Sequence, residues 1–169
     1  MRKKQTHIPL AIAATLLSVA VAVLLHFTKD AYKSWTIYCV LMPFVVLVIL
    51  NAQRYSRVNQ AEVRFGNILG SGFKMALLVA ALMGMWGILI FYVFPETENR
   101  MLYYAEQGMR DKGLKGEMLE TKLMWSQKYM KLFSFCYFLF TFLFFGTLAS
   151  LLGAAVARKK TAVQPLAGV

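Results

Sequence analysis

The sequence is poor in charged residues, cysteine, proline and histidine. Only 16% of its 169 residues are charged, whereas a typical soluble domain has about 25%, so a water-soluble globule is disfavoured. Two cysteines are too few for a disulfide scaffold. Four prolines beside thirteen phenylalanines and ten methionines argue against a disordered chain. Apolar residues are abundant instead: they make up 59% of the chain and give a mean hydropathy of +0.54.

The apolar residues are concentrated in four segments. A membrane-spanning helix needs about 20 mainly apolar residues, and such segments lie at about 8–27, 35–52, 72–94 and 132–157. The first follows a basic start, but its apolar run is longer than that of a signal peptide, so we expect an uncleaved span. Pro43 lies near the middle of the second and is a potential kink. The pattern predicts an all-α fold, an integral membrane four-helix bundle that forms a single domain over residues 1–169.

The basic charge is distributed unevenly between the connecting segments. The N-terminus, the segment between the second and third spans, and the C-terminus hold ten Lys and Arg residues but one acidic residue. The other two connections hold nine cations and seven acids, so +9 of the net charge of +11 lies on one side. Because Lys and Arg are retained in the cytoplasm during insertion, we predict that both termini are cytoplasmic and that residues 95–131 lie outside.

The same distribution bears on partners. Membrane orientation accounts for the basic residues without DNA or RNA, so we expect no nucleic-acid partner. We expect contacts with anionic lipid head groups instead. The candidates on the cytoplasmic side are Arg54, Arg57, Arg64 and Lys74.

Small residues recur at four-residue intervals in three of the spans. Such spacing places them on one helix face, where they let helix backbones approach closely. The candidates are Ala14, Ser18 and Ala22 in the first span, Gly66, Gly70, Ala76, Ala80 and Gly84 before and within the third, and Gly146, Ser150, Gly153 and Ala154 in the fourth. Packing within one bundle is the favoured interpretation; a dimer face or a sliding surface in a transporter is the alternative.

The fourth span also carries a cluster of phenylalanines. Its members are Phe133, Phe135, Phe138, Phe140, Phe142, Phe144 and Phe145. Contact with lipid or with neighbouring helices accounts for them, and one wall of a lipid-binding groove is the alternative hypothesis.

The segment 95–131 is too long for a simple connection and has helical signals of its own. Pro95 ends the third span, and Thr97 is a candidate N-cap for a further helix. From Gly116 onward, apolar and charged residues alternate as in an amphipathic helix that runs into the fourth span. This helix either lies on the membrane surface or lengthens the span above the membrane. A recognition surface for a partner is the third interpretation.

The pattern of polar residues does not indicate catalysis. The predicted spans contain no Asp or Glu, the residues that proton relays use. His7 and His26 fall on opposite sides of the predicted membrane. Cys39 and Cys136 have similar predicted depths, so a disulfide is conceivable, but two free thiols are the default interpretation. We therefore expect a protein that is not an enzyme and has no metal site and no cofactor.

Several stretches carry a family resemblance. They read FGNILGSGFK at 65–74, FYVFPE at 91–96, GLKGEMLE at 113–120 and GTLASLLGAA at 146–155. In these stretches the chain resembles a bacterial membrane family that is catalogued as domain of unknown function four-one-nine-nine and is common in Bacteroidota. The resemblance implies four spans and an inner-membrane location, and it implies no activity.

These observations lead to two functional hypotheses. The first is a non-enzymatic accessory or interaction subunit, either a homo-oligomer or a subunit with a membrane-protein partner. The alternative is a small carrier or flippase-like protein for a lipid-linked or apolar substrate, with the phenylalanine cluster as one wall of its groove.

Overall fold

The computed structural model describes residues 6–28, 35–59 and 64–163, of which 158–163 are described by their backbone alone. These residues form five α-helices and no strand. The helices are α1 (His7–His26), α2 (Thr36–Val58), α3 (Phe65–Val93), α4 (Glu96–Asp111) and α5 (Glu117–Val163). The predicted all-α fold, with an additional helical segment between the last two long helices, is confirmed.

Four of the helices, α1, α2, α3 and α5, are long and apolar enough to cross a membrane. Three of them, α2, α3 and α5, are longer than the predicted spans, because flanking residues of mixed polarity continue the helices. Thus α2 passes through Pro43 without a break and reaches Val58, and α3 begins at Phe65 instead of residue 72. The largest difference is in α5, which begins at Glu117 instead of residue 132.

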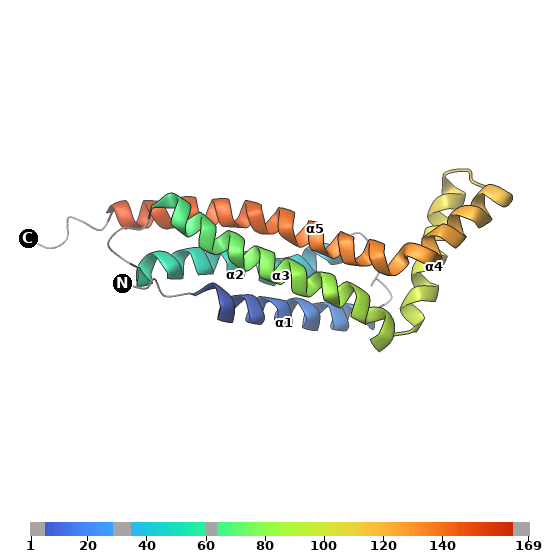
Figure 1. Cartoon of the computed structure of the whole chain (residues 1–169), viewed down its shortest axis with the longest axis horizontal. Helices are drawn as coiled ribbons and strands as arrows, with labels where there is room; N and C mark the ends of the chain where they lie inside the picture. Colours follow the sequence, from blue (N-terminus) through green and yellow to red (C-terminus); the bar gives the residue numbers. More distant parts are fainter. Residues whose placement is uncertain (1–5, 29–34, 60–63, 164–169) are drawn as a thin grey trace, which may run out of the picture.

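The four long helices lie side by side, and α4 lies across one end of them (Figure 1). We call this end the hairpin end, because α4 and the first turns of α5 form a helical hairpin there. The opposite end, where α2 ends and α3 begins, carries Arg54, Arg57 and Arg64 and is called the basic end. The central contact is between α3 and α5, and α2 also packs on both of these helices. In contrast, α1 contacts α2 and α3 but not α5.

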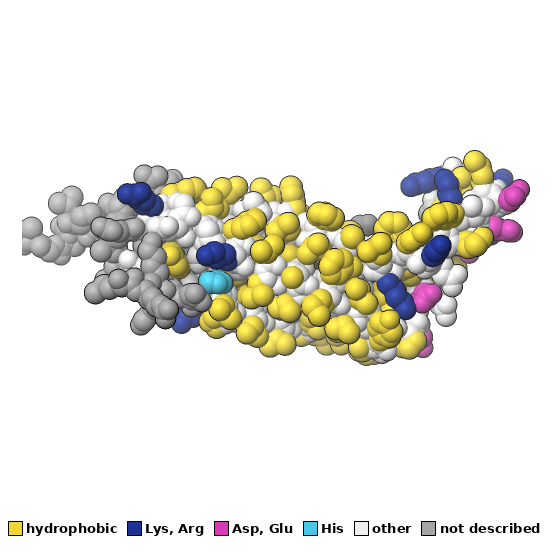
Figure 2. All heavy atoms as spheres, in the orientation of Figure 1, with side chains coloured by type: hydrophobic (Ala, Val, Ile, Leu, Met, Phe, Trp, Pro, Cys, Tyr) yellow, Lys and Arg dark blue, Asp and Glu magenta, His cyan; other side chains and the backbone are white. Residues whose placement is uncertain are grey.

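Apolar side chains occupy both the interior and the outer surface. Phe44 of α2 and Phe142 of α5 are completely buried, with ring centroids 5.1 Å apart. Large apolar side chains such as Leu16, Met42 and Phe140 are exposed on the outer faces of the helices. Figure 2 shows a broad apolar zone between the two charged ends. A surface of this kind is suited to lipid, since lipid tails are as apolar as the interior.

A tight turn at the C-terminal end of α4 forms the hairpin. Gly113 has a φ of 81°, a left-handed conformation that favours glycine. Its N–H donates to the carbonyl of Arg110, and the N–H of Leu114 donates to the carbonyl of Met109. These two bonds form a Schellman motif, which satisfies carbonyls that the end of α4 leaves free. Gly116, with a φ of 60°, then leads into α5.

Two expectations for this segment are now decided. The candidate N-cap Thr97 is wrong: α4 begins at Glu96 after Pro95, and no side-chain hydrogen bond caps it. The buried Thr97 hydroxyl has no hydrogen-bond partner among the described residues. The amphipathic segment is not a separate surface helix, because α5 runs without interruption from Glu117 through the whole bundle.

Candidate functional site

The most extensive helix contact among the described residues is the seam between α3 and α5. A Cβ added to Gly72 would lie 2.7 Å from the Ser150 Oγ, and one added to Gly146 would lie 2.5 Å from the Ala76 Cβ. Real Cβ atoms do not approach other atoms so closely, so these positions require glycine as the backbones stand. The Ser150 hydroxyl donates to the Gly146 carbonyl of its own helix. The glycines therefore allow the backbones of α3 and α5 to approach closely, while the Ser150 hydroxyl is satisfied within α5.

The small-residue candidates fall into two groups in the structure. Most are buried inside the bundle, and Ala22 is partly buried; the buried ones are Ala14, Ser18, Ala76, Ala80, Gly84, Gly146, Ser150, Gly153 and Ala154. Gly66 and Gly70 differ, since no atom of another element lies within 4 Å of a Cβ added to either. Gly70 is two residues before Gly72 and thus about 160° around the helix from it. It therefore lies away from the seam.

Two glycines of the seam are absent from the predicted candidates. Gly72 continues the row of Ala76, Ala80 and Gly84 at the same four-residue spacing, so the phase of that row is the signal that identifies it. Gly87 lies one turn further along, where an added Cβ would be 2.7 Å from the Phe138 ring and 3.0 Å from the Ser134 carbonyl oxygen.

A second row of small residues on α5 faces α2. A Cβ added to Gly153 would lie 2.9 Å from the Ala52 Cβ and 3.2 Å from the Ile49 Cα. Gly146 also contacts α2, because its added Cβ would be 2.7 Å from the Phe44 ring. The small residues of α5 thus allow this helix to pack closely against both α2 and α3. Contacts within the chain therefore already cover these residues.

A buried polar group joins three segments near the basic end. The Asn51 side chain is fully buried; its Oδ1 accepts a 2.8 Å hydrogen bond from the Thr6 hydroxyl. Its Nδ2 donates to the Ser71 Oγ at 3.3 Å. Buried polar atoms are costly without partners, so this group favours one register of α2, α3 and the start of α1. The sequence has no local signal for this group, because the partners of Asn51 lie 45 and 20 residues away.

The four lipid-contact candidates are all exposed. Arg54 and Arg57 lie on the last turns of α2, Arg64 precedes α3, and Lys74 lies three turns into that helix. Every acidic residue that the structure describes lies on α4 or the start of α5. The two ends of the bundle therefore differ in charge (Figure 2), as the sequence pattern predicts.

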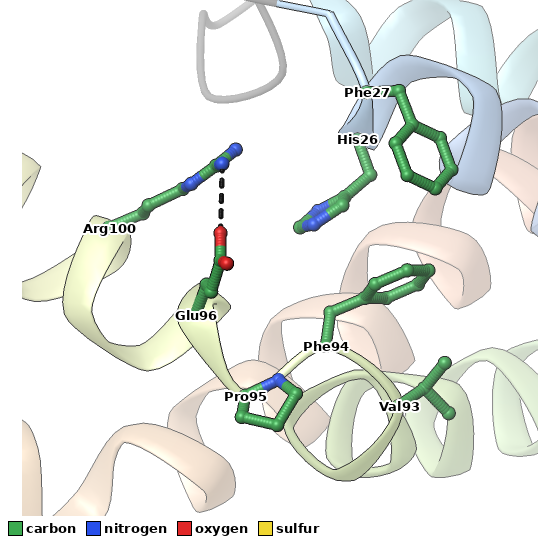
Figure 3. A pocket seen from close by; sticks show the side chains of 7 residues that line it. All are labelled: His26, Phe27, Val93, Phe94, Pro95, Glu96 and Arg100. Atoms are coloured by element: carbon green, nitrogen blue, oxygen red, sulfur yellow. Dashed lines mark hydrogen bonds and ion pairs between the residues drawn. The ribbon is translucent and has the colours of Figure 1, made fainter.

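A pocket of about 310 Å³ opens at the hairpin end, where α1 and α3 end and α4 begins. It is lined by His26, Phe27, Val93, Phe94, Pro95, Glu96 and Arg100. The His26 ring stacks on Phe94, with centroids 4.3 Å apart and an angle of 28°, and Phe27 packs edge-on against both. Facing these rings, the Arg100 Nη2 donates to the Glu96 Oε2 at 3.1 Å (Figure 3). The pocket therefore has one aromatic wall and one wall that carries both charges.

Lysines and aromatic rings surround the same end. The Lys131 Nζ lies 4.7 Å from the centre of the Tyr92 ring and so connects α5 to the end of α3. One turn earlier on α5, the Lys128 Nζ lies 5.7 Å from the Trp125 ring and 5.4 Å from the Tyr129 ring. Each of these distances is within the range of a cation–π interaction. Clustered Trp, Tyr and Lys are typical of a membrane–water boundary.

The phenylalanine cluster is not a single wall. Phe142 is buried, Phe135, Phe138 and Phe145 are partly buried, and Phe133, Phe140 and Phe144 point outward.

Cys39 and Cys136 are free thiols and are partly exposed.

The sequence was compared with known protein families, curated proteins and solved structures. A family described as "Protein of unknown function (DUF4199)" matches residues 10–159, which is most of the chain. No curated protein and no solved structure matches.

Proposed function

We propose that this protein, which belongs to the DUF4199 family, is a non-enzymatic accessory subunit that binds a membrane-protein partner through its helical hairpin. The hairpin is the observation that carries the proposal, since α4 and the start of α5 stand apart from the bundle (Figure 1). Tyr103, Met118 and Met124 are each more than half exposed there. Exposed large apolar side chains among charged residues are a common feature of interaction surfaces.

The location completes this proposal. The protein lies in the bacterial inner membrane and crosses it four times, with the basic end and both termini in the cytoplasm. The distribution of Lys and Arg supports this orientation. The hairpin is then on the outer side, where its partner would be another membrane protein or an extracytoplasmic domain.

The buried small residues also support a hairpin-mediated contact. Gly146, Ser150 and Ala154 are buried within their own chain, so a second copy would have to displace α3 or α2 to reach them. A partner that binds the hairpin leaves these contacts intact. Association of two copies through the hairpin is a separate outcome of the test below.

Site-specific photo-crosslinking in the native membrane tests the proposal. A photoreactive residue is placed at Tyr103 or Met118 of the full chain, and matched controls carry it at Leu16 or Met42, which are exposed on the bundle. We expect one defined protein adduct from the hairpin positions and lipid adducts from the controls. An adduct with the mass of a dimer would indicate a homo-oligomer. Protein adducts from the bundle positions alone would contradict the proposal.

A lipid-linked carrier is the second candidate, and the pocket at the hairpin end is the observation that favours it. A carrier needs to hold a polar head group near a boundary, and the pocket offers both charges there. Vesicles that contain the purified protein and a fluorescent polyprenyl phosphate provide the test. Stimulated movement of the probe between leaflets would support the carrier, whereas an unchanged rate would remove it.

A further inference from the structure

The pocket at the hairpin end lies where the apolar helices end. Its aromatic wall comes from the ends of α1 and α3, both of which are apolar over most of their length, and its charged wall comes from the start of α4. The neighbouring Tyr92–Lys131 contact has the composition of a membrane–water boundary. The pocket is therefore at the depth of lipid head groups.

Apolar side chains lie beside the pocket on the side of the bundle. Val93 of α3 and Phe27, which follows α1, both line the pocket and are 55% and 74% exposed. These side chains offer acyl chains a surface that continues from the aromatic wall of the pocket. A molecule with a polar head and apolar tails fits this arrangement better than a soluble molecule does.

The charges of the pocket select among head groups. Glu96 and Arg100 form an ion pair, so the polar wall has one negative and one positive group and little net charge. The Arg100 guanidinium has five N–H donors, and its bond to Glu96 leaves several of them for phosphate oxygens. The Glu96 carboxylate has further acceptor positions for an ammonium group. A head group that contains a phosphate and an ammonium can therefore pair with both residues at once.

We propose that this pocket binds the phosphoethanolamine head group of a phospholipid, with its phosphate on Arg100, its ammonium on Glu96 and its acyl chains along Phe27 and Val93. The stacked rings of His26 and Phe94 form the pocket wall that faces this ion pair. A purely anionic head group gains less, because Glu96 repels it as Arg100 attracts it.

A second ion pair on α4 provides a matched control. Arg110 and Glu106 have the same four-residue spacing, and the Arg110 Nη2 lies 2.6 Å from the Glu106 Oε1. Both pairs lie on α4, but only Glu96 and Arg100 line the pocket. Substitution of either pair removes the same charges from the same helix.

The experiment is native mass spectrometry of the full chain in mild detergent with equal amounts of phosphatidylethanolamine and phosphatidylglycerol. We expect the wild type to retain phosphatidylethanolamine about fivefold better, the difference that one charge contact at a membrane surface supplies. Glu96→Gln should reverse the preference, because it leaves a pocket with positive charge alone. Arg100→Gln should weaken retention of both lipids. Arg110→Gln and Glu106→Gln should leave the wild-type ratio unchanged.

Two outcomes would overturn the proposal. The first is an unchanged lipid ratio in Glu96→Gln, provided that its melting temperature matches the wild type and thus shows a folded protein. The second is a wild type that prefers phosphatidylglycerol. Soluble glycerophosphoethanolamine is added in a further arm; if it displaces the lipid at equal concentration, the pocket recognises a free head group and the lipid assignment is wrong. Photo-crosslinking at Tyr103 is independent of these results, so failure of one proposal does not affect the other.

Discussion

The α3–α5 seam and α1 use small residues in different ways. In the seam, Gly72 and Gly146 each receive a side chain from the facing helix, so the two surfaces interlock. In α1, Ala14 and Ser18 are buried, but the same helix exposes Leu16 at 64% and contacts only α2 and α3. Because α5 packs against both α2 and α3, the helices of the seam cannot easily move apart when a residue there is enlarged. In contrast, α1 can move outward. The same residue types therefore have different energetic importance in the two places.

The largest expected effect is that of Gly146→Leu. The new side chain would overlap Ala76 and Phe44, so we expect a loss of about 3 kcal/mol in the free energy of unfolding, the upper end for overpacking. Denaturant unfolding in mild detergent measures it. Gly70→Leu is the control, because nothing lies within 4 Å of its added Cβ. Equal losses in the two variants would remove the distinction between seam and surface.

Asn51→Ala should have the next largest effect. It removes the acceptor of Thr6 and the donor to Ser71, at a cost of about 2 kcal/mol for buried groups left unsatisfied. Because Thr6 precedes α1, hydrogen exchange should quicken in the first turns of α1 more than in the α3–α5 seam. The exposed Asn99→Ala provides the control, and a similar change in it would count against the polar group.

Ala14→Leu tests whether α1 can move outward to accommodate a larger side chain. Ala14 is completely buried, but α1 has no contact with α5 to hold it in place. We expect a loss of about 1.5 kcal/mol, half of that for Gly146→Leu, in the same unfolding measurement. Leu16→Ala on the exposed face should change stability little. A loss as large as that of Gly146→Leu would show that α1 is held as rigidly as the seam.

The smallest expected effect is in the hairpin. Gly113→Ala places a side chain at a φ of 81° and should cost about 1 kcal/mol locally. Gly108→Ala, inside α4 with open space around it, should instead stabilise the helix by about 0.5–1 kcal/mol. Hydrogen exchange in α4 should therefore quicken in the first variant and slow in the second. If hydrogen exchange in α4 changed in the same direction in both variants, the turn assigned to Gly113 would be contradicted.

Sequence reasoning could predict the helices because their signals are local. Apolar runs and the positions of Lys and Arg are enough to place four long helices and a basic end. The contacts between helices depend on which face of each helix a residue occupies, and four-residue spacing alone does not say which face meets a neighbour. For this reason Gly66 and Gly70 were predicted as packing residues, although Gly72 is the glycine that lies in the same row as Ala76, Ala80 and Gly84. The pocket was not predictable, because His26 and Phe27 are far in sequence from Phe94 and Arg100 and meet them only where the ends of α1 and α3 converge with the start of α4.

The continuity of α5 has a mechanical consequence. Its 47 residues give about 70 Å of unbroken helix, more than twice the roughly 30 Å of a bilayer's hydrocarbon core; the helix changes direction where it leaves the bundle (Figure 1). A helix bends stiffly because every turn is closed by its own backbone hydrogen bonds. The hairpin is therefore joined to the bundle by continuous helix and not by a loop. A displacement of the hairpin would pass along this helix to the part of α5 that packs on α2 and α3.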